Sequence, residues 1–310
     1  LCALQQSLSK NIVTFNGLDI SRSLWALAVL GGDKDLFMKV TPNVLELLPQ
    51  CTVANLTQIL FAYTCVGCYE KNLFTTIVQV LVPEKVNKDA DCAYLYPALL
   101  DIRHRYPKFS PTGLGRYLEY TRGSFWQLQT LEKADAKFGK SIADCFSETN
   151  INDKSSDVFK SVNVVHEADG VDIDGYRVDL TLSFESLKEI AGTLQVDWDE
   201  ALHDRECKAA VIIHADHSLH RKTQQPLGPA VMRHRYLSRE NYMVLNIQER
   251  EWAELMSSEG DRAGMLALLE DKLKRCVQKA MTRLVQRHVY FEEKKSRKAE
   301  EQKMKENADQ

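Results

Sequence analysis

Residues 211–252 decide the fold of this chain and read VIIHADHSLHRKTQQPLGPAVMRHRYLSRENYMVLNIQEREW. The branched apolar run at the start is typical of a buried strand, and Pro226, Gly228 and Pro229 indicate a turn. The segment after the turn mixes apolar and basic residues with helical spacing. The predicted order is a strand at 211–213, a turn at 224–229, a helix at 230–239, a strand at 242–247 and a helix from 249 to 255.

Strand and turn signals continue upstream of this stretch. Residues 166–175 predict a strand that ends in an Asp-Gly turn, and a second strand is expected from Tyr176 to Leu182. Phe184 to Leu194 has the composition of a helix. Together with 211–252, these elements predict a small α/β domain over residues 151–262.

The ordered set of motifs resembles the RAP domain, a family of RNA-binding modules with a restriction-endonuclease-like α/β fold. The matching pieces, in the family's order, are His214-Ala215-Asp216-His217, His220, Leu227-Gly228, Arg233 to Leu237, Tyr242 to Ile247 and Glu251-Trp252. Tyr176 to Leu180 is similar to the family's first strand, which carries an Asp, here Asp179. The resemblance covers residues 160–270. It implies RNA binding in an organelle, with the mitochondrion favoured over the plastid.

The first 100 residues are expected to be helical and repetitive. Residues 23–30 and 59–66 are similar apolar runs about 36 residues apart, and each is followed by a glycine turn and a second apolar helix. A period near 36 with two helices per unit is typical of an α-solenoid. An ordinary bundle with two similar hairpins is the alternative. Residues 1–150 are therefore predicted to form an α-helical repeat domain, with its boundary in the polar segment 150–156.

Basic residues on the predicted helix at 230–239 and in the loop before it are expected to contact RNA phosphates. They are Arg221, Lys222, Arg233, Arg235 and Arg239. Two other windows are basic: 103–140 has eight Lys or Arg against three acids, and 272–298 has ten against two. They supply the secondary candidates Arg103, Arg105, Arg116, Lys274, Arg275 and Arg283. In the first window, core aromatics beside solvated arginines explain the pattern equally well.

Residues 263–310 are predicted to form one long basic helix. Apolar residues recur at three- and four-residue steps in its first part, and the last part has almost no apolar face. Such an arm would fray alone and would need a partner if ordered. An RNA or ribonucleoprotein surface would supply that partner, and a solvated tail is the alternative for 300–310.

A metal-dependent nuclease of the resembled fold needs one Asp, followed by an acidic-x-Lys motif on the next strand. Asp179 can supply the first carboxylate and Asp216 the second, but His214 stands at the acidic position and no Lys follows at the usual place. The expectation is therefore a degenerate, non-catalytic site without a bound metal. The cluster of His214, His217, His220 and His234 is expected to face RNA or to be a remnant of an active site, since zinc-ligand spacing is absent.

Composition argues against a disulfide-rich, a zinc-binding or a membrane-spanning protein. The 310 residues carry eight cysteines and a formal net charge of −3. The scattered cysteines indicate reduced, packed thiols, and the single Cys65-x-x-Cys68 pair favours helix packing over zinc. No apolar run approaches the roughly 20 residues of a membrane helix. The chain starts at Leu1, so we expect that an N-terminal piece is missing or removed, and any targeting peptide cannot be seen.

These patterns favour a non-catalytic RNA-binding protein of an organelle that binds or stabilises rRNA as part of a ribonucleoprotein, including a divergent mitochondrial ribosome. The expected fold is an α-solenoid, a small α/β domain and a long C-terminal helix. No cofactor, small-molecule substrate or membrane partner is expected. A metal-dependent endoribonuclease or RNA-processing factor, and a protein-binding helical scaffold, are the alternatives.

Overall fold

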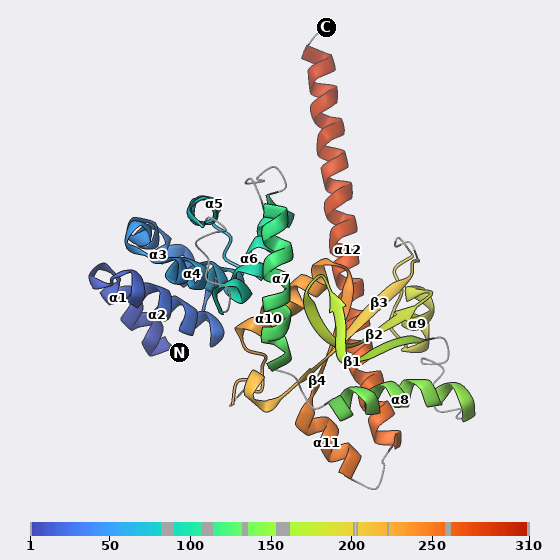
Figure 1. Cartoon of the computed structure of the whole chain (residues 1–310). Helices are drawn as coiled ribbons and strands as arrows, with labels where there is room; N and C mark the ends of the chain where they lie inside the picture. The colour runs from blue at the N-terminus through green and yellow to red at the C-terminus, as the bar shows by residue number, and fades with distance from the viewer. Residues whose placement is uncertain are drawn as a thin grey trace. The chain divides into compact units, whose positions relative to one another are not determined.

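The computed structural model describes residues 2–81, 90–106, 114–131, 136–152, 162–200, 202, 204–221, 223–257 and 262–308. The chain is mostly helical and carries a small mixed sheet and a long C-terminal helix (Figure 1). Within the described residues, four strands form this sheet in the order β1-β2-β3-β4. The expected combination of a mainly helical chain, a small sheet and a long C-terminal helix is confirmed.

The chain divides into two compact units. The helical unit consists of Leu1–Ala134, Asp172–Arg177 and His214–Tyr236, and the sheet unit of Asp135–Val171, Val178–Ile213 and Leu237–Gln310. These units cut across the three domains expected from the sequence, because α8 (Ala136–Asn152) belongs to the sheet unit. The division at residues 150 and 262 stays a prediction.

Seven helices lie in the described part of the helical unit's first segment. They are α1 (Cys2–Asn11), α2 (Gly17–Val29), α3 (Lys34–Leu47), α4 (Val53–Val66), α5 (Lys71–Val80), α6 (Ala90–Arg105) and α7 (Leu114–Leu131). The two apolar runs compared in the sequence fall on α2 and α4. Each run is the first helix of a hairpin, with α3 or α5 as the second, so the predicted pair of helical hairpins is confirmed.

Capping residues fix where these helices begin and end. Asn16 forms a capping box with Asp19 at the start of α2, and Thr52 forms one with Asn55 at the start of α4. Helix α4 ends at Gly67, whose φ of 70° is a left-handed cap that glycine adopts without strain. The local sequence therefore determines both ends of α4.

Packing in the helical unit joins the first helices of the two hairpins and continues through α6 to α7. Helix α2 contacts α4, α4 contacts α6, and α6 contacts α7. The amide of Asn55 donates a 3.0 Å hydrogen bond to the Ser21 hydroxyl, with both side chains buried. Since a buried amide without a partner is costly, this bond aligns α4 on α2.

The strands and their connecting helices follow the predicted order. The strands are β1 (Asn163–Ile173), β2 (Tyr176–Phe184), β3 (Cys207–His214) and β4 (Tyr242–Gln248), and the helices are α9 (Leu187–Thr193), α10 (Gly228–Arg239) and α11 (Glu249–Ser257). Strand β3 starts four residues before its predicted position. Its first residues, Cys207 to Ala210, are less branched, yet they pair antiparallel with the end of β2.

Burial explains the composition of the strands. Leu180 of β2 pairs with Val211 of β3, and most residues of both strands are buried, which suits continuous apolar runs. In β4, by contrast, buried and half-buried residues alternate. Strand β4 therefore presents one face to the core, where Met243, Leu245 and Ile247 are buried.

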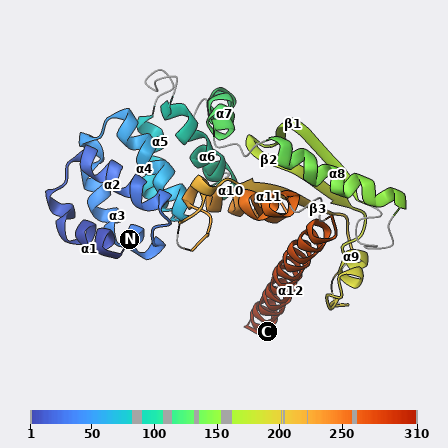
Figure 2. The same ribbon diagram turned by 90° about the horizontal axis from the view of Figure 1, so that it is seen from below.

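Helices complete the core of the sheet unit. Trp252 of α11 is fully buried and donates a 3.4 Å hydrogen bond to the Ser141 hydroxyl of α8. Helix α8 lies close to β1 (Figure 2). A Cβ atom added at Gly139 of α8 would lie only 3.1 Å from the His166 ring of β1. The thiol of Cys276 in α12 (Arg262–Ala308) lies 3.1 Å from the Val244 carbonyl oxygen of β4.

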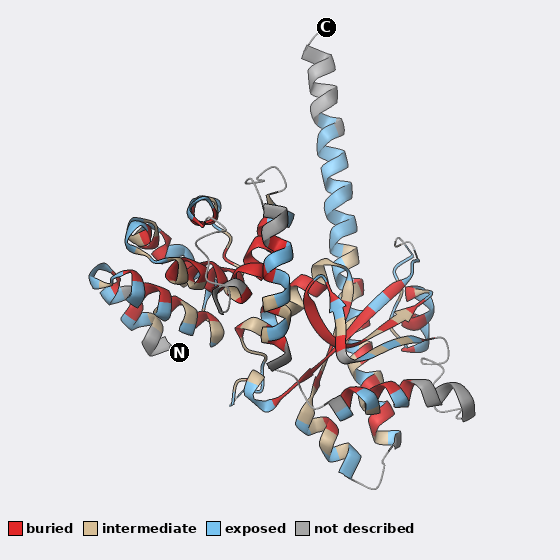
Figure 3. Cartoon of the chain, in the orientation of Figure 1, coloured by how far each residue is buried: buried red, intermediate tan, exposed pale blue. Residues whose placement is uncertain are grey.

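The first part of α12 packs and the second part does not. Leu269, Leu273 and Val277 are fully buried at helical spacing. Every residue from Gln286 to Lys298 is exposed (Figure 3). The predicted long helix with a charged arm is confirmed, and the described helix continues to Ala308.

Candidate nucleic-acid interface

The turn between β1 and β2 belongs to the helical unit and has a defined geometry. Asp174 and Gly175 have φ angles of 49° and 81°, the pattern of a two-residue hairpin turn. The Gly175 amide donates to the Asp172 carboxylate over 2.6 Å. The predicted Asp-Gly turn is therefore confirmed.

Helix α7 holds this turn through one amide side chain. Gln129 is buried, and its Nε2 donates a 2.7 Å hydrogen bond to the Gly175 carbonyl oxygen. Its Oε1 accepts from the Arg177 amide over 3.1 Å. One glutamine thus pairs with two main-chain groups of the hairpin, as a neighbouring strand would.

Two tyrosines bind the next residue of the turn. The Tyr96 hydroxyl of α6 donates to the Asp174 carbonyl oxygen over 2.7 Å, and the Tyr236 hydroxyl of α10 pairs with the Asp174 carboxylate at 2.8 Å. Burial is the main cause that raises the pKa of Tyr96 to about 12. On the exposed side of the turn, Arg122 forms a 2.7 Å ion pair with Asp172.

Aromatic rings connect these anchors. Tyr96 stacks on Phe125 with centroids 5.3 Å apart, and Phe125 meets the edge of Tyr176 at 5.2 Å. Tyr176 stacks on Tyr236 at 4.4 Å. Burial raises the pKa of the Tyr176 hydroxyl well above its ordinary value. This cluster lies in one compact unit although its members come from three segments of the chain.

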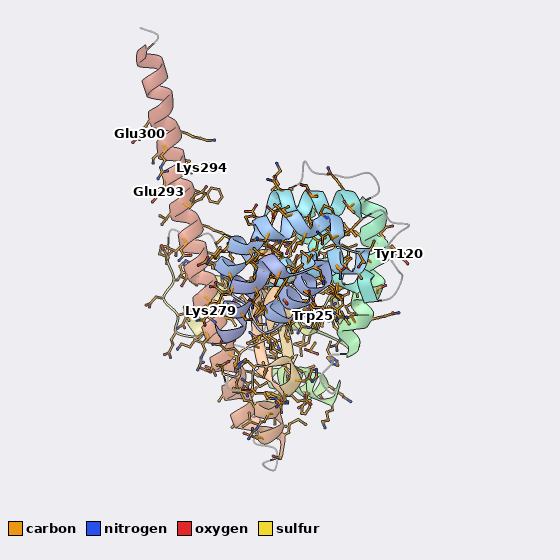
Figure 4. The ribbon with its side chains drawn as sticks, turned by 90° about the vertical axis from the view of Figure 1, so that its left-hand side faces the viewer. Trp25, Tyr120, Lys279, Glu293, Lys294 and Glu300 are labelled. Atoms are coloured by element: carbon orange, nitrogen blue, oxygen red, sulfur yellow. The ribbon has the colours of Figure 1, made fainter. Side chains whose placement is uncertain are left out.

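A cavity of about 220 Å³ adjoins the cluster. Its buried lining comes from Phe61, Phe125, Gln129, Tyr176, Ala230 and Met232, and its half-exposed lining from Trp25, Val29, Tyr94, Leu128, Pro229 and Arg233. Trp25 projects from α2 (Figure 4). Its indole N–H is buried and has no hydrogen-bond partner among the described residues.

Two of the arginines expected to contact RNA donate hydrogen bonds to main-chain oxygens within the helical unit, and their contact with RNA stays a prediction. Arg235 donates to the carbonyl oxygens of Thr64 and, over 3.2 Å, of Cys65 at the end of α4. Arg233 donates to the Arg177 carbonyl oxygen over 3.2 Å. Cations are favourable at the C-terminus of a helix, so Arg235 stabilises the docking of α10 on α4.

The C-terminal end of α6 presents cations beside an aromatic ring. The Arg105 guanidinium lies 3.5 Å from the centre of the Tyr69 ring, and that of Arg235 lies 5.8 Å from it. The Tyr69 hydroxyl donates a 2.5 Å hydrogen bond to the buried Asp101 carboxylate. Burial, followed by the Asp101 charge, raises the pKa of Tyr69 to about 12. Arg103 and Arg105 are exposed.

The other expected RNA contacts are dispersed. Arg221 is exposed in the loop before α10, and Arg239 is half-buried beside Glu240 at 3.7 Å. On α12, Arg275 pairs with Asp271 at 2.9 Å, Lys274 is half-buried and Arg283 is exposed. Lys222 and the side chain of Arg116 lie outside the described residues.

The arm of α12, defined here as residues 286–298, combines exposed cations with exposed rings. It carries five Lys or Arg against two Glu. The Tyr290 and Phe291 rings lie 5.8 Å apart and are each more than half exposed. Glu293 and Lys294 project from the arm, and Glu300 projects from α12 just beyond it (Figure 4). The sequence analysis expected an RNA or ribonucleoprotein surface as the partner of this charged segment, but the individual candidates that it named on α12 ended at Arg283.

The carboxylates of the nuclease alternative have different surroundings. Asp179 is buried and accepts a 2.6 Å hydrogen bond from the Ile213 amide of the paired strand. Asp216 is exposed in a short 3-10 helix. Among the described residues, no three His, Cys, Asp or Glu side chains form a group that could hold a metal ion.

Histidines and cysteines of the predicted clusters are largely internal. His214 is buried with its ring 5.5 Å from that of His234, whereas His217 is exposed and His220 is half-buried. Of the two expectations for His214, this burial does not fit the one that it faces RNA, because the residue ends the buried strand β3, and the other, a remnant of an active site, stays a prediction. Cys65 and Cys68 are both buried, and burial raises the pKa of the Cys68 thiol to about 11.

Sequence reasoning missed the residues that build the cavity and the turn anchor. Gln129 and Trp25 carry no charge and belong to no motif, and their partners lie far along the chain. Helix α7 carries two glutamines, Gln127 and Gln129, and nothing in the sequence marks which of them is buried. Trp25 had been seen only as part of a repeated apolar run.

No helix in the described part of the chain combines the length and the apolar character that crossing a membrane requires. No protein-family model matches the chain, and no curated protein matches it.

Proposed function

We propose that this chain is a non-catalytic RNA-binding protein of an organelle, with the mitochondrion favoured, which binds or stabilises rRNA within a ribonucleoprotein. The α-helical hairpins are proposed to be part of an α-solenoid, and the α/β region a RAP-like domain. The observation that carries the proposal is the arm of α12, where cations and two aromatic rings are exposed on one helix.

Both kinds of side chain on the arm suit a single-stranded nucleic acid. Lys and Arg release counterions from phosphates, and exposed aromatic rings stack on bases. An isolated helix without an apolar face is marginal in water, so binding a phosphate backbone would also stabilise the arm. Arg103, Arg105 and Arg221 are proposed as further phosphate contacts because they are exposed.

Arg233 and Arg235 are less suitable as tests of RNA contact. Their guanidinium groups donate to carbonyl oxygens of the helical unit, so a charge reversal there would loosen packing as well as remove charge. A loss of affinity in such a variant would not separate the two causes.

The test compares charge reversals in RNA-binding titrations over a range of salt. Lys294→Glu with Lys298→Glu should weaken binding to single-stranded RNA and reduce the slope of log K against log salt by roughly 1.4, the value for two phosphates. Lys34→Glu with Lys39→Glu on α3 is the control, because these lysines are also exposed and the net charge changes equally.

A second pair of variants tests stacking. Tyr290→Ala with Phe291→Ala should weaken binding by about 10-fold or more at every salt concentration, since each stacked base contributes about 1–3 kcal/mol. The salt slope should stay unchanged because no charge is lost. Equal binding by all of these variants and the parent would refute the arm as the RNA surface.

The organellar and rRNA parts need a measurement on the native protein. Crosslinking with RNA sequencing, and a sucrose gradient of the same lysate, should give a few fixed organellar rRNA positions and sedimentation with a ribosomal peak. Crosslinks to precursor ends in light fractions would favour a processing factor instead. Protein partners that persist at high salt after RNase treatment would favour a helical scaffold.

A further inference from the structure

Exposed cations lie along one side of α12 between residues 279 and 298. Figure 1 shows α12 as one continuous helix, in which each residue is turned by about 100° from the one before it. With Gln286 taken as 0°, six exposed cations fall between about 20° and 120°. This cationic stripe consists of Lys279, Arg283, Arg287, Lys294, Arg297 and Lys298.

The acids of the same stretch lie on another side of the helix. Glu292, Glu293 and Glu300 fall between about 240° and 340°, and all three line one surface groove. Helix α12 therefore separates its charges, with a positive side and a negative side. An evenly mixed surface, which would suit a helix that is only solvated, is not what this stretch presents.

The cations of the stripe are available to a ligand. Among the described residues, none of them forms an ion pair, and only Arg287 is hydrogen-bonded, to the Asn241 side-chain oxygen over 3.2 Å. Two cations outside the stripe differ in this respect. Arg275 pairs with Asp271 at 2.9 Å, and Lys295 pairs with Glu292 at 2.7 Å.

Two aromatic rings fill the widest interval of the stripe, between Arg287 and Lys294. Tyr290 and Phe291 lie at about 40° and 140°, and each is more than half exposed. The Lys294 ammonium is 6.0 Å from the centre of the Tyr290 ring. Rings in this position can stack on the bases of an unpaired strand, whereas the bases of a duplex remain stacked on one another.

We propose that the stripe binds one unpaired segment of RNA, whose backbone follows α12 from Lys279 to Lys298 while the acids face away from it. These two residues are about 28 Å apart along the helix axis. At about 3.4 Å per stacked nucleotide, the segment is about eight nucleotides long. The inference rests on the proposed RNA-binding function, names unpaired RNA as the ligand and extends the contact beyond the arm.

Packing fixes the first part of the stripe in place. Val277 and Met281 are buried and lie at about 180° and 220°, so Lys279 and Arg283 are on the side of α12 that faces away from the core. Their positions are set by the folded sheet unit before any ligand binds. Such preorganisation lowers the ordering cost of binding.

The first experiment titrates the full-length chain with an unpaired RNA of about 12 nucleotides, within the usual range of single-strand sites, over a range of salt. Lys279→Glu with Arg283→Glu should lower the affinity about 10-fold and reduce the slope of log K against log salt by roughly 1.4, the value for two phosphates.

Arg275→Glu with Lys295→Glu is the matched control. It also reverses one lysine and one arginine on α12, but both lie outside the stripe and are paired with acids. This variant should keep nearly the parent affinity and salt slope. Equal losses in the two variants would refute the stripe, because net charge alone would then explain the effect. Melting curves report whether both variants fold.

The pairing state and the length of the RNA provide the second experiment. The parent should bind the unpaired RNA at least about 10-fold more tightly than the same sequence in a duplex, and Tyr290→Ala with Phe291→Ala should remove most of this preference. Affinity should rise with length up to about eight nucleotides and change little beyond that. A duplex or a tetranucleotide that binds as tightly as the long unpaired RNA would overturn the inference.

These results separate the inference from the proposed function. RNA binding that depends on Lys294 and Lys298 but is equally affected by the stripe and control pairs would keep the arm as an RNA surface and refute the stripe. A parent chain that binds neither unpaired nor duplex RNA would refute both.

Discussion

Gly175 is constrained by its backbone conformation, by a close neighbouring ring and by two main-chain hydrogen bonds. Its φ of 81° lies in the left-handed region, and a Cβ at this position would lie 2.7 Å from the Tyr96 ring. Its carbonyl oxygen and its amide are both hydrogen-bonded. No other amino acid combines this backbone conformation with the absence of a side chain.

Gly175→Ala should therefore destabilise the protein by about 1–3 kcal/mol, through backbone strain and displacement of Tyr96. Gly123→Ala is the control, because Gly123 lies within α7, is exposed, and a Cβ there would meet nothing within 4 Å. That variant should gain up to about 1 kcal/mol from helix propensity. Urea denaturation of both variants measures the difference, and equal midpoints would contradict the role of Gly175.

Gln129→Leu removes both hydrogen bonds that the Gln129 side chain makes to the hairpin. It leaves the Gly175 carbonyl and the Arg177 amide without this partner in a buried site, at a cost of roughly 1–3 kcal/mol for each group. We expect a lower free energy of unfolding and faster hydrogen exchange of the Arg177 amide. Gln278→Leu, the same substitution at an exposed helical position on α12, should leave both quantities nearly unchanged.

At the scale of elements, local patterns in the sequence predicted most helices and strands. The spacing of Leu269, Leu273 and Val277 is enough to predict α12, because helical periodicity is a property of the segment itself. The Asp174-Gly175 turn is likewise a local signal. These elements need no knowledge of their partners to be recognised.

Contacts between elements were harder to predict. Gln129 and Gly175 are 46 residues apart, and Arg235 reaches carbonyl oxygens 170 and 171 residues earlier in the chain. The sequence analysis expected Arg233 and Arg235 to contact RNA phosphates because they are basic residues on the predicted helix at 230–239. The carbonyl oxygens at the end of α4 that accept from Arg235, and the Arg177 carbonyl oxygen that accepts from Arg233, are not visible as a pattern.

The two parts of α12 should respond differently to change. Removal of residues 286–310 should shift stability by less than about 0.5 kcal/mol, because the described residues 286–298 are exposed. Leu273→Ala should cost about 2–5 kcal/mol, because Leu273 is fully buried. Thermal unfolding of the two variants tests whether only the first part of α12 contributes to stability. A large loss of stability on truncation would show that the arm also contributes packing energy.

At the scale of the whole molecule, buried phenols couple stability to alkaline pH. Burial raises the pKa values of Tyr69 and Tyr96 to about 12, above the value of about 10 in an unfolded chain. The stability that these two tyrosines contribute is fully present below about pH 10. It is lost as the pH rises toward 12, because the same phenols ionise at a lower pH in the unfolded chain than in the folded one.

Unfolding midpoints in urea should therefore fall between pH 9.5 and 12, while absorbance at 295 nm shows late ionisation of these phenols. Tyr96→Phe should be less stable at pH 8, because it loses the hydrogen bond to Asp174, and its stability should fall less steeply with pH. A stability that is constant over this range would contradict the burial of both hydroxyl groups.

The helical unit is built from three separate segments of the chain, so it can be completed only after the last of them has been synthesised. The α4 helix is translated early, whereas Arg235, whose side chain covers its last carbonyl oxygens, follows 170 residues after Cys65. At roughly 5–20 residues per second, the nascent chain waits on the order of 10 s for this contact. During that interval the apolar surfaces that later meet Tyr176 and Met232 are open to chaperones or to other nascent chains. A slowed ribosome between codons 134 and 214 would lengthen that exposure and lower the yield of folded protein.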